Sequence, residues 1–247
     1  TMTTPYLIKP FELGADIIQH SATKFLSGHG IVIGGLLVDS GQFDWESSKK
    51  FPTLSQPYNG FHNLIFSEEF GPTAFIQRAR KEGLRDFGAC MAPTTAFHIL
   101  QGIETLSVRM AQHVANTREI VRFLEEDDQV VRVGYPELDH HPDRELAKAL
   151  LPQGCGAVFS FDLAGGRKAG SAFVDALNLF SHLANVGDAK SLVIHPASTT
   201  HHRMDADALA AGGIGEGTIR LSVGLEDSKD LIADLKQGLR AARKVMK

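Results

Sequence analysis

The sequence predicts an α/β fold in two parts that are joined by a long helix. Short apolar runs flank a glycine-rich turn near the N-terminus, apolar residues recur at spacings of mostly three or four over residues 94–126, and strand and helix patterns alternate afterwards. The chain has 247 residues, of which 43% are hydrophobic, so it can bury a sizeable core. We expect one part over residues 1–92 and a second, which includes the linking helix, over residues 93–247.

The first part is expected to contain a pair of buried strands. Residues 16–20 and 31–38 are largely apolar, and Gly28 and Gly30 in the link between them permit a tight return of the chain. Parallel strands need a crossover of a dozen or more residues, which is usually a helix. Because this link is too short for that, we expect the two strands to pair antiparallel.

Lys24 directly follows the first of these strands and is the candidate for chemistry. A lone lysine is usually a solvated surface charge, but the neighbours of this one favour a different interpretation. Ser21 and Thr23 can donate hydroxyl protons to a phosphate without adding a fixed charge, and ligands of open α/β sheets lie beyond the carboxyl ends of strands. An amine in this setting suits a cofactor that forms a Schiff base with lysine.

The later elements are predicted from periodicity. Residues 94–126 carry the apolar face of a helix, residues 157–163 are typical of a strand, residues 168–181 of an amphipathic helix, and residues 228–246 of a closing helix. The apolar positions of the first helix are Ile99, Ile103, Leu106, Met110, Val114, Ile120 and Leu124. Those of the closing helix are Leu231, Ile232, Leu235 and Leu239.

Residues 218–223 alternate between polar and apolar side chains, as a half-buried strand does. Ile219, Leu221 and Val223 share one face, and Arg220 lies on the other. Taken alone, such a polar face is more often solvated than functional, because it is the usual outer surface of an antiparallel sheet.

The segment around Lys24 resembles the cofactor attachment site of the pyridoxal-phosphate enzymes of cysteine and methionine metabolism. The matching run is DI, three further residues, and SATKFLSGHG over residues 16–30. The resemblance implies the fold-type I architecture, with a large domain of mainly parallel sheet and helices and a smaller α/β C-terminal domain. It also implies pyridoxal 5'-phosphate as the cofactor, held covalently by Lys24 and contacted at its phosphate by Ser21 and Thr23.

The resemblance continues down the chain. GACMAP over residues 88–93, GIETL and Arg109-Met110 resemble the passage into the family's linking helix, and NVGDAKSL with HPASTTH resemble its active-site segment from the smaller domain. NVGDAKSL is typical of O-acetylhomoserine sulfhydrylases, and residues 51–62 resemble the insertion of that subgroup. The resemblance implies that Arg220 and Asn185 bind the substrate, with the α-carboxylate held by the planar guanidinium fork.

The reaction implied by this resemblance is a γ-replacement: O-acetyl-L-homoserine and sulfide give L-homocysteine and acetate, a step of methionine biosynthesis. Methionine γ-lyase, cystathionine γ-synthase or lyase, and O-succinylhomoserine sulfhydrylase chemistry are alternatives on the same scaffold. Outside this class, the chain would be a non-enzymatic module. Because family members are considerably longer, we expect a carboxyl-terminal piece whose partner is the missing N-terminal segment of the same protein, within a homotetramer.

Composition and spacing exclude several other functions. The net charge of −4 provides no basic field for nucleic acid, and two cysteines suit reduced cytoplasmic thiols rather than a disulfide framework. No apolar run is long enough to span a membrane. No metal site is expected, because the histidine pairs at 140–141 and 201–202 lack a zinc-ligand spacing. The glycine-rich residues 213–217 precede a strand, whereas a dinucleotide-binding loop follows one.

Overall fold

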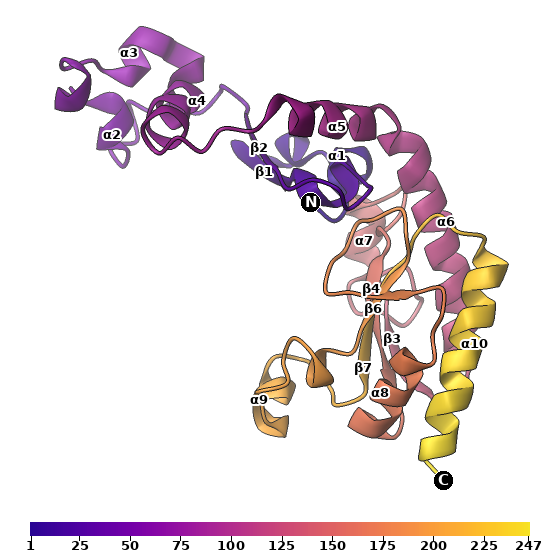
Figure 1. Ribbon diagram of the computed structural model, residues 1–247. Helices are drawn as coiled ribbons and strands as arrows, with labels where there is room; N and C mark the ends of the chain where they lie inside the picture. The colour runs from indigo at the N-terminus through magenta and orange to yellow at the C-terminus, as the bar shows by residue number, and fades with distance from the viewer.

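Two separate sheets and ten α-helices make up the structure, a computed structural model that describes residues 1–247 (Figure 1). The helices are α1 (Thr4–Leu7), α2 (Pro52–Ser55), α3 (Phe66–Phe70), α4 (Ala74–Arg78), α5 (Pro93–Glu104), α6 (Leu106–Glu125), α7 (Arg144–Leu150), α8 (Gly166–Asp175), α9 (Ala206–Ala211) and α10 (Ser228–Val245). The strands are β1 (Ile17–Ser21), β2 (Gly35–Asp39), β3 (Val130–Gly134), β4 (Val158–Leu163), β5 (Ser181–His182), β6 (Leu192–Ile194) and β7 (Thr218–Ser222).

β1, β2 and the link between them, residues 17–39, form what we call the lysine hairpin. The two strands pair antiparallel, which confirms the expectation from the short link. The resemblance implies a mainly parallel sheet for the large domain as a whole, whereas these two strands have no crossover that would allow a parallel pairing. The expected burial is wrong for both strands. In β1 only His20 is buried, and β2, which begins at Gly35, is mostly exposed, because only one of its faces packs against the core.

The five remaining strands form the C-terminal sheet, in the order β3-β4-β7-β6-β5. All neighbours pair antiparallel except β5 and β6. β7 lies at the centre and is buried on both faces. The alternating pattern alone favours a solvated polar face, and the structure shows that this face is covered. Ile219 and Leu221 join the main core with side chains of α8 and α10. Because side chains alternate along a strand, Arg220 faces away from these helices.

The helices differ from the sequence prediction in two places. The expected helix over residues 94–126 is broken at Thr105 into α5 and α6, and Ile103 beside the break is 38% exposed instead of buried. α8 ends at Asp175, six residues early, because the backbone N–H groups of residues 178–180 donate to the Asp234 carboxylate and not to helix carbonyls. α10 is confirmed within one residue. No helix has the length and apolarity needed to cross a membrane.

Residues 41–86 form a helical lobe with a small core of its own. It contains α2, α3 and α4 and projects away from the C-terminal sheet, beside the lysine hairpin (Figure 1). Trp45, Leu54, Phe66 and Ala74 are buried within it and make no part of the main core. The residues that resemble a subgroup insertion, 51–62, lie in this lobe.

Candidate active site

Lys24 lies in a single π-helical turn, Ala22–Leu26, which directly follows β1 and which we call the lysine turn. Its backbone angles, φ −90° and ψ −135°, are not helical, so the chain kinks at this residue. The apolar side chains on either side, Ala22 and Phe25, are fully buried, while Lys24 itself is partly exposed. The turn is therefore anchored by its apolar residues, and the lysine amine is left free to meet other groups.

Asn185 lies opposite the lysine, on the loop that leads to β6. The Nζ of Lys24 donates a hydrogen bond to the side-chain oxygen of Asn185. The loop is held against the turn because the N–H of Ala189 donates to the carbonyl of Gly28 at 2.7 Å. Gly187 has a φ of +79°, and a Cβ there would lie 2.7 Å from the Phe25 nitrogen. This close approach requires glycine.

Arg220 completes this group of residues from β7. Its Nη2 donates to the backbone carbonyl of Asn185 at 3.3 Å, and the side chain is half-buried without any ion pair. Burial lowers the pKa of the guanidinium, because the charged form loses hydration. Its remaining N–H groups are available to an anion. The structure thus brings together three of the residues predicted from the sequence: Lys24, Asn185 and Arg220.

The two predicted phosphate-binding hydroxyls differ in their surroundings. The Ser21 side chain makes no hydrogen bond within the chain, whereas the Thr23 hydroxyl accepts from the N–H of Gly34 at 3.0 Å. The contact from Thr23 Oγ1 to the Gly34 carbonyl is long, at 3.3 Å, so this proton can turn to a stronger acceptor. An amine, two hydroxyls and an unpaired guanidinium form a donor set that fits an aldehyde cofactor with a phosphate group.

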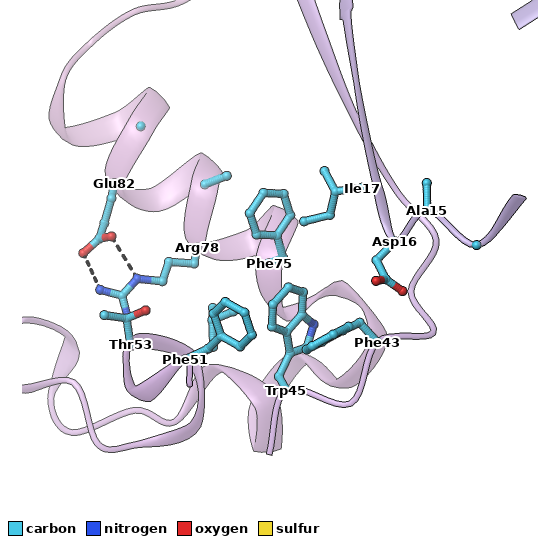
Figure 2. Close-up of a pocket in the computed structure, with 14 residues that line it drawn as sticks. Ala15, Asp16, Ile17, Phe43, Trp45, Phe51, Thr53, Phe75, Arg78 and Glu82 are labelled. Carbon is cyan, nitrogen blue, oxygen red and sulfur yellow. Dashed lines mark hydrogen bonds and ion pairs between the residues drawn. The ribbon is translucent and has the colours of Figure 1, made fainter. Parts of the chain in front are cut away.

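A cavity of about 610 Å³ lies elsewhere, between the helical lobe and the start of β1 (Figure 2). Figure 2 shows aromatic rings of the lobe along its wall and the Arg78–Glu82 ion pair at its edge. Asp16 and Ile17 line it at the beginning of β1, whereas Lys24 follows the end of that strand. None of the residues predicted for the active site lines this cavity.

Two residues of α6 next to the site received no role from the sequence. Arg109 is buried and donates hydrogen bonds to the lysine turn, and the signal that could have revealed it is a charged residue beside Met110 on an apolar helical face. The His113 ring packs edge-on against Phe25, with centroids 5.1 Å apart, and its Nδ1 lies 2.7 Å from the Val223 carbonyl. Burial lowers the pKa of His113 to about 4.

Comparison with known proteins places this site in a family. Residues 1–240 match the family described as Cys/Met metabolism PLP-dependent enzyme. The chain is 48% identical over 238 residues to the sulfhydrylase FUB7 of Fusarium oxysporum, covering 96% of this chain and 55% of the relative. It is 46% identical over 234 residues to O-acetyl-L-homoserine sulfhydrylase 1 of Thermus thermophilus, covering 95% and 55%.

Comparison with a solved structure supports the same family. A putative O-acetylhomoserine (thiol)-lyase of Campylobacter jejuni, which contains N'-pyridoxyl-lysine-5'-monophosphate, superposes with a TM-score of 0.89 and 38% identity over 97% of this chain and 57% of that one. The chain belongs to the Cys/Met metabolism PLP-dependent enzyme family. It spans about half the length of the curated relatives it matches. The fold-type I architecture and the cofactor expected from the sequence are confirmed.

Proposed function

We propose that the protein converts O-acetyl-L-homoserine and sulfide to L-homocysteine and acetate, with pyridoxal phosphate as cofactor. Similarity to proteins named sulfhydrylases supports this reaction, and so does the sequence NVGDAKSL in the loop that carries Asn185. The observation that carries the proposal is the meeting of the Lys24 amine and the unpaired Arg220 guanidinium at Asn185. An amino-acid substrate needs both groups, one for proton transfer and one for its carboxylate.

Three residues would hold the cofactor. Lys24 would bind its aldehyde through Nζ, and Ser21 and Thr23 would donate hydroxyl protons to its phosphate oxygens. When bound, pyridoxal phosphate supplies an electron sink for the negative charge that develops on the substrate. The Ser21 hydroxyl is free to donate its proton to the phosphate. The Thr23 hydroxyl must first turn its proton away from the Gly34 carbonyl.

Arg220 would orient the substrate. A guanidinium presents two parallel N–H groups to a carboxylate, so it fixes both the position and the plane of the amino acid. Asn185 accepts from Lys24 through its side chain and from Arg220 through its backbone, so it spaces the two cations relative to each other. The reacting carbons of the substrate would then lie beside Lys24 Nζ.

Lys24 would move the protons. Its Nζ would take the α-proton of the substrate and then shuttle the β-proton. The C–O bond at the γ carbon breaks with both electrons leaving on acetate, and a C–S bond to hydrosulfide forms at the same carbon. No oxidant or reductant is needed, because one nucleophile replaces another.

The organisation of the whole protein is part of this proposal. Residues 1–92 would belong to the large domain that carries the Schiff-base lysine, and residues 93–247 would comprise the linking helix and the smaller domain with Arg220. The family resemblance supports a homotetramer, and the two free cysteines fit a cytoplasmic location. Substrates would be small molecules, with no nucleic acid or membrane involved.

The test replaces Lys24 by alanine in the holoenzyme, with Lys244→Ala, an exposed lysine in the last turn of α10, as the matched control. We expect Lys24→Ala to lose turnover by at least about 10³-fold, because the group that transfers protons is gone. The pyridoxyl peptide obtained after borohydride reduction should disappear with it. Lys244→Ala should keep both. A trapped pyridoxyl group on a lysine other than Lys24 in the native protein would refute the assignment.

Product assays would then define the reaction. The holoenzyme is supplied with O-acetylhomoserine or O-succinylhomoserine as acceptor, with sulfide or cysteine as nucleophile, and with methionine alone. Homocysteine from O-acetylhomoserine and sulfide is the expected main product. Cystathionine as the main product, or thiol release from methionine, would assign a different member of the same class of reactions.

A further inference from the structure

Arg109 is a buried cation without an anionic partner. It lies in the first turn of α6, it is only 6% exposed, and it forms no ion pair. Its Nε donates to the Thr105 hydroxyl at 3.1 Å, and its other donors reach backbone carbonyls. Burial lowers the pKa of this guanidinium. A buried charge with no counter-ion is unfavourable unless its hydrogen bonds compensate for the lost hydration. The hydrogen bonds of Arg109 must therefore supply that compensation.

The acceptors are the carbonyls that end two helical segments. Nη1 donates to the carbonyl of Phe25 at 2.9 Å, and Nη2 donates to those of Leu26 at 3.3 Å and Gly102 at 2.6 Å. Phe25 and Leu26 end the turn that carries Lys24, and Gly102 lies in the last turn of α5. Carbonyls at such ends carry partial negative charge. One guanidinium therefore ties the lysine turn to α5 and α6.

The stability of α6 does not account for an arginine here. The first turn of a helix is its positive end, so a cation at Arg109 gains nothing from its own helix. A methionine would fill much of the same space without burying a charge. A lysine would keep the charge, but its ammonium lacks the planar fork that reaches three carbonyls at once.

The backbone just after the lysine turn lies very close to the Arg109 side chain. Gly28, just after the turn, has a φ of +74°, and a Cβ there would lie 2.2 Å from Nη1 of Arg109. Only glycine leaves room for the guanidinium at this point. One turn further along α6, the His113 ring packs against Phe25. Both α6 side chains thus contact the residue that follows Lys24.

We propose that Arg109 is the positioning residue for Lys24. Its guanidinium fixes the carbonyls that end the turn, and it thereby sets where the lysine amine meets Asn185 and the aldehyde of the cofactor. This inference rests on the function proposed for Lys24. Loss of the fork should slow the steps that depend on Lys24 Nζ, while Arg220 continues to bind the substrate carboxylate.

The test compares Arg109→Lys and Arg109→Met with Arg118→Lys in the holoenzyme. Arg118 lies on the same helix but is paired with Glu137 and does not contact the lysine turn. For each Arg109 variant we expect kcat for O-acetylhomoserine to fall about 10- to 100-fold, with KM changed by less than about threefold. The yield of pyridoxyl-Lys24 peptide after borohydride reduction should fall as well. Arg118→Lys should match the native enzyme in all three.

Several outcomes would overturn the positioning role. One such outcome is an Arg109→Lys variant with native kcat and native trapping of Lys24. Another is a rise in KM with kcat unchanged. If Arg109→Met does not fold, Arg109→Lys decides; a lysine variant that also fails to fold would show a purely structural role. If Lys24→Ala retains turnover, the proposed function has failed instead. Inactive Lys24→Ala together with fully active Arg109→Lys refutes the positioning role alone.

Discussion

The lysine hairpin and the C-terminal sheet are built from similar apolar strands but are covered very differently. In the C-terminal sheet, β7 is buried on both faces, and α6, α8 and α10 pack together along one side (Figure 1). In the lysine hairpin, β2 is mostly exposed, and Ile33 just before it is 89% exposed. The residue expected to do the chemistry therefore lies in the less covered region.

This difference shows that the position of Lys24 depends on contacts outside its own sheet. The lysine turn is held by Arg109 from α6, and the loop before β6 is held to the same turn by the Ala189–Gly28 hydrogen bond. His113 links the two regions, since its ring contacts Phe25 and its Nδ1 donates to the carbonyl of Val223, just after β7. Contacts from the better covered region thus hold the turn that carries Lys24.

The largest expected effect comes from the same substitution made in each region. Ile219→Ala removes a fully buried side chain at the centre of the C-terminal sheet, and should lower the free energy of unfolding by about 2–5 kcal/mol through lost burial and the cavity left behind. Ile33→Ala should change it by less than about 0.5 kcal/mol, because that side chain is already in water. Urea denaturation of the chain followed by circular dichroism measures both. Equal losses would mean that Ile33 is covered in solution.

The sequence predicted which residues meet at the candidate site better than it predicted the contacts that support them. Lys24 and Arg220 stand in recognisable motifs next to strands that periodicity also indicates. The early end of α8 was not predictable, because the acceptor for residues 178–180 is Asp234, 54 or more residues away in the chain. The break at Thr105 was not predictable either, because the apolar spacing of three or four residues continues across it from Ile99 to Met110. The role of Arg109 is not evident from the sequence for a similar reason: two of its acceptors, the carbonyls of Phe25 and Leu26, lie 84 and 83 residues earlier, and periodicity does not reveal such contacts.

The pH dependence of stability tests the link between the two regions. Burial lowers the pKa of His113 to about 4, so the native state keeps the ring neutral where the unfolded chain, with the ordinary value of 6.5, takes up a proton. Stability from this residue is therefore fully present above pH 6.5 and is lost as the pH falls towards 4. The total loss is about 3 kcal/mol, of which about 2 kcal/mol falls between pH 6.5 and 5.

The control for this prediction is a variant that cannot titrate. His113→Asn keeps a donor near the Val223 carbonyl, and its unfolding free energy should vary less between pH 6.5 and 5 than that of the native chain. Some slope will remain, because burial also lowers the pKa of His195, which acts in the same direction. An identical pH slope in the native chain and in His113→Asn would show that His113 is not buried as a neutral ring.

The smallest expected effect on stability concerns the polar contact between α10 and the loop before β5. The buried Asp234 carboxylate accepts from three backbone N–H groups, those of residues 178–180. Asp234→Asn leaves one oxygen and sets an NH₂ group against the remaining donors, so we expect a loss of about 1–3 kcal/mol. Asp205→Asn is the matched control, because Asp205 is an exposed N-cap whose role asparagine can fill with a change of only a few tenths of a kcal/mol. Equal effects in thermal denaturation would mean that the 178–180 loop is held by its apolar neighbours, and that polar contacts do not contribute to the difference between the two regions.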